Sequence, residues 1–247
     1  MEYTTSTWNG FRRLDFIFEG HEALLIQPET PEEGMNYLIK TEYFGAFPNA
    51  EIEMLRRGWH LAYIKNDFRW GTIADQDRRA AFCRFLTEEF GLAPRCIPVG
   101  MSCGGLEAIC FGARHPEAVT SLYLDAPVVN LLSCPFGMGR GNSLDEAFPE
   151  IKAAYGLDEV SILSFRMHPL DRMGALIENK IPVLMVYGDS DVIVPYEENG
   201  ALLVKKYQEE GLEVVVYGKE GCGHHPHGLE DPEPIVRFML DHACKKA

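Results

Sequence analysis

The sequence has few basic residues for its length. Only 23 of its 247 residues are Lys or Arg, against 37 Asp or Glu, which gives a formal net charge of −14. Nucleic acids and anionic membrane surfaces both attract clustered cationic side chains, so we expect neither as a partner. Solubility is the simplest reason for such an acidic surface, and a field that steers a substrate is the alternative.

Long hydrophobic runs and paired cysteines are also missing. No stretch approaches the ~20 apolar residues of a membrane-spanning helix, and the first residues lack the basic start and apolar core of a secretory signal. The seven cysteines are scattered, odd in number and without a Cys-x-x-Cys pair. Such thiols are typical of a reducing compartment, where they pack as small apolar side chains. We therefore expect a cytoplasmic location and no membrane partner.

Apolar runs alternate with helical patterns over most of the chain. The runs predict a hairpin at residues 12–18 and 22–26 and further strands at 37–44, 60–64, 96–99, 121–124, 183–187 and 213–217. Helices are expected at 49–58, 75–90, 103–114, 196–210 and 234–245. This alternation predicts an α/β fold with a mostly parallel sheet flanked by helices. A chain of this length can bury a full core, so we expect a single domain over residues 1–247.

Residues 127–180 do not follow this alternation of strands and helices. They separate two predicted strands by some fifty residues, begin with the Gly-rich stretch 135–141 and then become helical. A long insertion in a compact domain is usually functional. We expect a small helical lid over the carboxyl edge of the sheet. The alternative is a crossover helix with an elaborated surface loop.

Residues 100–104, Gly-Met-Ser-Cys-Gly, match the pattern G-x-S-x-G. They follow a predicted strand and open a predicted helix, as a nucleophile elbow requires. Flanking glycines suit the strained strand-to-helix turn that projects Ser102 above the sheet. Cys103 is the weaker candidate nucleophile, because a pattern centred on it would need glycine where the chain has Met101. The backbone N–H of Cys103, at the start of the helix, is expected to stabilise an oxyanion.

An acidic turn follows the strand predicted at residues 183–187. It contains Asp189 and Asp191, and its place at the carboxyl edge puts both on the same side of the sheet as Ser102. We favour Asp191 as the carboxylate that orients the base, since Asp189 suits an Asx turn. Asp125, which follows the strand predicted at residues 121–124, is the reserve candidate.

The loop after the last predicted strand is rich in histidine. His224 directly follows Gly-Cys-Gly, whose glycines allow a sharp turn, and is the preferred base, with His225 second. His227 is expected to support the site or to contact substrate. His224, His225 and His227 together with Cys222 also suggest a metal site. Their spacing in the sequence is too tight for the usual pattern of paired ligands, so we expect no metal.

The three blocks, in the order Ser, acid, His, resemble the α/β-hydrolase superfamily over nearly the whole chain. The resemblance implies a twisted sheet of about eight strands and a triad of Ser102, Asp191 and His224. Residues 43–48, 125–127 and 224–232 are similar to a bacterial subgroup related to the prolyl-oligopeptidase and acyl-esterase branches. The peptidase branch carries a propeller domain, which we do not expect in this chain, so the resemblance favours an esterase.

The resemblance also implies a second oxyanion donor in the loop after the third strand of the family. That loop corresponds to residues 43–48, which lack the His-Gly pair of many lipases and esterases. Gly45 and Ala46 are the candidates.

We accordingly expect a serine hydrolase that cleaves a carboxylic ester, such as an acyl or acetyl ester of a small or sugar-like alcohol, with no cofactor. The alternatives are a small serine aminopeptidase or amidase, an acyltransferase, and a non-catalytic ligand-binding protein on the same fold. The oligomeric state stays open, a homodimer included. The residues expected to contact substrate are Phe44, Phe136, Met138, Arg140, His225 and His227. For the side chains of the insertion, a role in the lid core is the equal alternative.

Overall fold

Nine strands form one sheet in the computed structural model, which describes residues 2–245. The strands are β1 (Thr4–Trp8), β2 (Phe11–Phe18), β3 (His21–Gln27), β4 (Tyr37–Lys40), β5 (His60–Ile64), β6 (Ile97–Met101), β7 (Leu122–Asp125), β8 (Val183–Gly188) and β9 (Val214–Lys219). Their order is β1-β2-β3-β5-β4-β6-β7-β8-β9. The β1–β2, β2–β3 and β3–β5 pairs are antiparallel, and all pairs from β5 to β9 are parallel. The parallel strands therefore bring their carboxyl ends to one edge.

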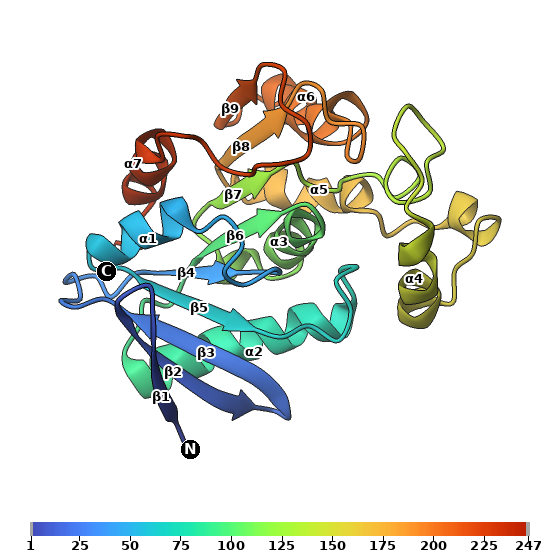
Figure 1. Ribbon diagram of the computed structural model, residues 1–247. Coiled ribbons are helices and arrows are strands. Elements are labelled where there is room, and N and C mark those ends of the chain that lie inside the picture. The colour runs from blue at the N-terminus through green and yellow to red at the C-terminus, as the bar shows by residue number, and fades with distance from the viewer. Residues whose placement is uncertain (1, 246–247) are drawn as a thin grey trace.

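Helices cover both faces of this sheet (Figure 1). They are α1 (Asn49–Arg56), α2 (Ile73–Phe90), α3 (Cys103–Arg114), α4 (Phe148–Tyr155), α5 (Pro169–Glu178), α6 (Gly200–Glu209) and α7 (Glu233–Asp241). One buried cluster joins α1 and α7 to one face, and another joins α2, α3, α5 and α6 to the other. Strands covered on both faces are mostly apolar, and here the central strands carry charged residues at their carboxyl ends, Lys40 in β4 and Asp125 in β7. The predicted α/β fold with a mostly parallel sheet is confirmed. No helix within residues 2–245 is long and apolar enough to cross a membrane.

Three elements differ from their predicted form. The edge strand β1 was not predicted because Thr-Thr-Ser-Thr-Trp shows no apolar alternation, and its residues are mostly exposed. The strand predicted at 37–44 ends at Lys40, so residues 41–44 belong to the loop beyond it. The helix predicted at 196–210 is interrupted at Asn199, whose side-chain oxygen accepts hydrogen bonds from the N–H groups of Val129 and Asn130, both at 3.0 Å.

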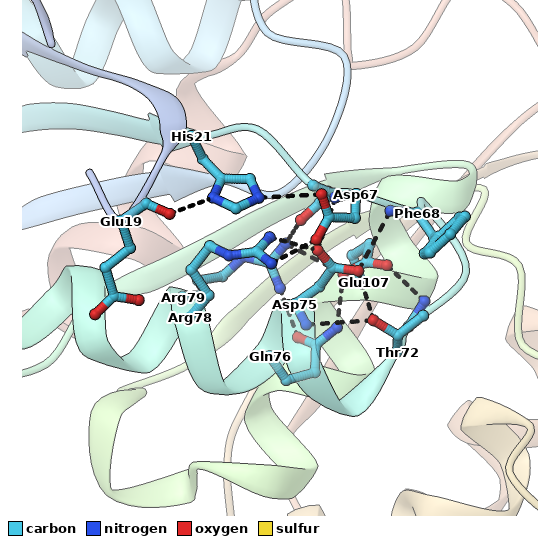
Figure 2. A network of polar contacts seen from close by, with 12 residues as sticks. Glu19, His21, Asp67, Phe68, Thr72, Asp75, Gln76, Arg78, Arg79 and Glu107 are labelled. Carbon is cyan, nitrogen blue, oxygen red and sulfur yellow. Dashed lines mark hydrogen bonds and ion pairs between the residues drawn. The ribbon is translucent and has the colours of Figure 1, made fainter. Parts of the chain in front are cut away.

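A buried polar network fixes the loop that follows β5 (Figure 2). The Arg79 guanidinium of α2 donates to Asn66 at 2.5 Å and to Glu107 of α3 at 3.1 Å. Glu107 also accepts from Gln76 at 2.6 Å and from the Gly71 N–H at 2.5 Å. Burial raises the pKa of the Glu107 carboxyl to about 7. The network therefore ties residues 66–71 to both α2 and the helix that follows Ser102.

The insertion has two structural parts. Its last helix, α5, packs against α3 and belongs to the layer that covers the sheet. The part that contains α4 extends beyond the sheet, on the right in Figure 1. There Glu150 of α4 accepts from Arg69 at 2.8 and 2.9 Å and from the Trp70 indole at 3.0 Å. This part is held to the loop after β5 and stands over the carboxyl edge.

The turn from β6 into α3 requires glycine at two positions. Ser102 has φ 55° and ψ −121°, a strained conformation for a residue with a side chain. A Cβ on Gly100 would press on the Gly104 backbone and lie 2.7 Å from the Gly105 Cα, and a Cβ on Gly105 would lie 2.5 Å from the Pro127 Cβ. The chain can therefore approach α3 this closely only without side chains at these positions.

Replacing Gly100 with alanine should destabilise the fold by about 1–3 kcal/mol, the usual cost of overpacking. Gly174→Ala in α5 is the matched control, because a Cβ there meets nothing within 4 Å. Alanine is also the better helix former by about 1 kcal/mol. Urea unfolding of both variants measures the difference. Equal stability of the two variants would contradict a tight turn at Gly100.

Candidate active site

Ser102 lies at the junction of β6 and α3, at the carboxyl edge of the sheet. Its N–H donates to the Asp125 carbonyl at 2.9 Å, and its carbonyl accepts from the Val128 N–H at 3.1 Å. These bonds hold the strained turn against the end of β7. The Ser102 side chain is half-buried at the start of a helix, where the positive end of the helix dipole favours negative charge.

Three predicted catalytic side chains meet at this edge although they are far apart in sequence. The His224 Nε2 lies 3.0 Å from the Ser102 Oγ, and the His224 Nδ1 lies 2.7 Å from the Asp191 Oδ2. With Nδ1–H donated to the carboxylate, Nε2 is left as the acceptor for the serine proton. The arrangement has the connectivity that serine nucleophiles use for activation.

The environment of Asp191 keeps it ionised. Its other oxygen, Oδ1, accepts from the N–H groups of Ile193 and Val194, both at 2.8 Å. Burial by itself raises the pKa of this carboxyl, but the hydrogen bonds from His224 and the two N–H groups outweigh it and hold the pKa below its ordinary value. A buried, charged Asp191 can orient the imidazole and stabilise an imidazolium.

A second carboxylate–imidazole pair lies beside the first. The His227 Nδ1 is 2.7 Å from the Asp125 Oδ1, and the Asp125 Oδ2 accepts from the Gly228 N–H at 2.6 Å. Both side chains are almost fully buried. Asp125, the reserve candidate for the acid, therefore binds His227 rather than His224.

The N–H groups expected to stabilise an oxyanion differ in their surroundings. The Cys103 N–H opens α3 and has no backbone acceptor within residues 2–245. The Ala46 N–H donates to the Tyr43 carbonyl at 3.0 Å, and Gly45 does not line the pocket at Ser102. Tyr43, which was not among the expected site residues, lines that pocket, and its hydroxyl accepts from Arg69 at 2.9 Å. Burial raises the pKa of Tyr43, so the hydroxyl keeps its proton.

The pocket above Ser102 has a volume of about 330 Å³. Its polar lining includes Tyr43, Arg69, Glu146 and the three neighbouring histidines. The apolar lining includes Ala46, Phe47, Trp70, Met101, Leu144, Ala147 and Ile193. Arg69 is paired with Glu150, whereas the Glu146 carboxylate is exposed. The pocket therefore combines an apolar wall with one exposed acidic group.

Four residues expected to contact substrate lie elsewhere. Phe136 is buried in the insertion, where its ring stacks on Phe148 with centroids 4.6 Å apart, so it packs in the core of the insertion. Phe44 packs between Trp8 and Tyr63 in the cluster on the α1 side. The remaining two, Met138 and Arg140, lie in the exposed Gly-rich loop and do not line the pocket. Of the expected contacts, His225 and His227 line it.

No protein-family model matches the sequence, and no curated protein matches it. Solved structures do match. A puromycin-hydrolyzing peptidase of Mycobacterium tuberculosis is 16% identical, with a TM-score of 0.66, over 93% of this chain and 38% of that chain. An acylaminoacyl peptidase of Pyrococcus horikoshii is 14% identical, with a TM-score of 0.68, over 100% and 42%. Dipeptidyl peptidase 4 of Porphyromonas gingivalis is 13% identical, with a TM-score of 0.69, over 98% and 35%.

The fold is that of the α/β-hydrolases. The chain spans 35% to 42% of the length of these three structures. In this chain, the three side chains that meet come from the strand-to-helix turn after β6 and from the loops after β8 and β9.

The roles of the two carboxylates can be separated by mutation. Asp191→Asn should slow labelling of Ser102 by a fluorophosphonate about 10³–10⁴-fold, because an amide cannot hold the His224 tautomer that accepts the serine proton. Asp125→Asn should slow it far less, since Asp125 binds His227. Ser102→Ala gives the unlabelled baseline. The opposite ranking would transfer the acid role to Asp125.

Proposed function

We propose that this α/β-hydrolase is a serine hydrolase that cleaves carboxylic esters of small molecules. The observation that carries the proposal is the continuous hydrogen-bonded chain from Asp191 through His224 to Ser102, with the serine opening into a pocket. A chain of this kind activates a hydroxyl that is otherwise a weak nucleophile.

In the proposed reaction, His224 Nε2 takes the Ser102 proton as the Oγ attacks the ester carbonyl. The oxyanion that forms is met by the Cys103 N–H and by the Tyr43 hydroxyl, and each such donor contributes about 3–4 kcal/mol. The imidazolium returns its proton to the departing alcohol. Water then attacks the acyl-enzyme, with His224 as the base again, and free acid leaves.

The pocket supports a small acyl group. A volume of about 330 Å³ lies at the small end of the range of about 300–1,000 Å³ for ligand pockets. Its apolar wall suits a short acyl chain, which would gain by leaving water.

Glu146 favours a second candidate function, that of a small aminopeptidase. An exposed carboxylate in the pocket suits an acyl group that carries an ammonium, as an aminoacyl group does. The names of the similar solved structures are those of peptidases. The two candidates share the nucleophile and differ in the bond cleaved and in the acyl group.

The bond cleaved can be determined with matched leaving groups. We expect turnover of short p-nitrophenyl esters that is abolished in Ser102→Ala and by prior fluorophosphonate treatment. Amino-acid p-nitroanilides test the peptidase candidate in the same assay. Turnover of the anilides alone would overturn the esterase proposal, and failure of the wild type to react with the fluorophosphonate would overturn the serine hydrolase.

The kind of acyl group that the pocket accepts can be tested by mutating Glu146. If the pocket binds an ammonium, Glu146→Gln should raise KM for aminoacyl p-nitrophenyl esters about tenfold or more and leave acetyl ester turnover unchanged. Glu159→Gln is the matched control, because Glu159 is an exposed residue of the same insertion that does not line the pocket. Equal KM values for wild type and Glu146→Gln would exclude ammonium recognition by this carboxylate.

A further inference from the structure

Three imidazoles lie close together in the lining of the candidate site. The rings of His224, His225 and His227 are pairwise edge-on, with centroids 4.9 to 5.0 Å apart. One ligand nitrogen of each ring lies within 4.8 Å of those of the other two. The proposed hydrolysis uses only the first of these imidazoles, so the mechanism does not account for the cluster.

Two of the three rings are oriented in the way that metal-binding histidines are oriented. His224 and His227 each direct Nδ1 to a buried carboxylate at 2.7 Å, that of Asp191 and that of Asp125. A neutral histidine that donates Nδ1–H to a carboxylate keeps an unprotonated Nε2, and carboxylate–histidine pairs of this type are the usual support of zinc ligands.

The third ring is restrained by an aromatic neighbour. The His225 ring stacks on Phe47, with centroids 5.6 Å apart and planes 14° from parallel. The Cys222 thiol donates to the His225 carbonyl at 3.6 Å, so it is turned toward the loop backbone. The cluster therefore offers three nitrogen ligands on one short loop.

We propose that His224, His225 and His227 bind a divalent metal ion such as zinc and that the bound ion inhibits the hydrolase. Zinc accepts nitrogen ligands in a tetrahedral site and is often held by three protein ligands, with the fourth position open. The His224 Nε2 that would ligate the ion is the atom that lies 3.0 Å from the Ser102 Oγ. One lone pair cannot bind the metal and accept the serine proton, so occupancy removes the base.

The binding half of this proposal is independent of the reaction, whereas the inhibition half rests on the proposed function. Binding is therefore measured first, by titrating zinc chloride into Ser102→Ala and following the heat. We expect one ion per chain, and affinity lost in His225→Gln and in His227→Gln. Asp125→Asn, which removes the support of His227, should weaken binding about 10–100-fold.

Two control variants separate this site from other zinc ligands. His21→Gln is the matched control, because His21 also pairs with a carboxylate, Asp67 at 3.0 Å, yet lies outside the cluster. It should bind zinc as the parent does, and so should Cys222→Ser. Circular dichroism checks that each variant is folded. Absence of binding to the parent, or binding lost only in Cys222→Ser, would overturn the site.

Inhibition is then measured on wild type as the rate of fluorophosphonate labelling and of ester turnover across the same zinc range. Both should fall at the zinc concentrations that saturate binding and recover with a chelator. Zinc that binds without slowing the labelling would overturn the inhibitory role. If no ester is turned over, the labelling and the calorimetry still decide the metal site, so failure of the two proposals can be told apart.

Discussion

The strained backbone of Ser102 is the constraint on which the rest of the site depends. A positive φ at a residue with a side chain costs about 1–3 kcal/mol and persists only where surrounding contacts fix it. Two sets of contacts fix it here. The glycines at the start of α3 pack directly against the β6 backbone, and hydrogen bonds join the turn to the end of β7. The network of Arg79 and Glu107 in turn holds α3 against α2. The position of the nucleophile is thus set by the packing of the whole parallel half of the sheet.

Asp125 connects the nucleophile to the loop that carries the base. Its carbonyl accepts from the Ser102 N–H, and its carboxylate binds His227 and the Gly228 N–H. The two ends of the Ser102–His224 hydrogen bond are therefore positioned against the same residue at the end of β7. This explains why a second buried carboxylate lies so close to a site whose base already has one. A shift of the histidine loop would have to break the contacts of Asp125 as well as those of Asp191.

Local sequence patterns predicted the parts of the site that each lie within one short segment. Glycines around Ser102 mark a tight turn, and an acidic or histidine-rich loop after an apolar run marks the carboxyl edge of a parallel sheet. The pocket wall was not predictable in this way. Tyr43, Arg69 and Glu146 come from three segments whose meeting depends on the path of the insertion, and no period or motif encodes that path. Lys40 is a similar case, since a lysine at the end of a strand gives no sign that it will be buried against Glu51.

The insertion is hydrogen-bonded to the segments that carry the candidate site, and under the proposed function this links substrate binding to catalysis. Glu150 holds α4 to Arg69, and Arg69 in turn donates to the Tyr43 hydroxyl on the oxyanion side. On the other side, the Asn142 N–H donates at 2.8 Å to the carbonyl of Val192, the residue next to Asp191. A displacement of the insertion would therefore disturb both Tyr43, the proposed oxyanion donor, and the loop that carries Asp191. Since catalysis requires reacting groups to stay within a fraction of an ångström of their positions, the proposed hydrolysis is best served by small substrates that fit beneath the insertion as it stands.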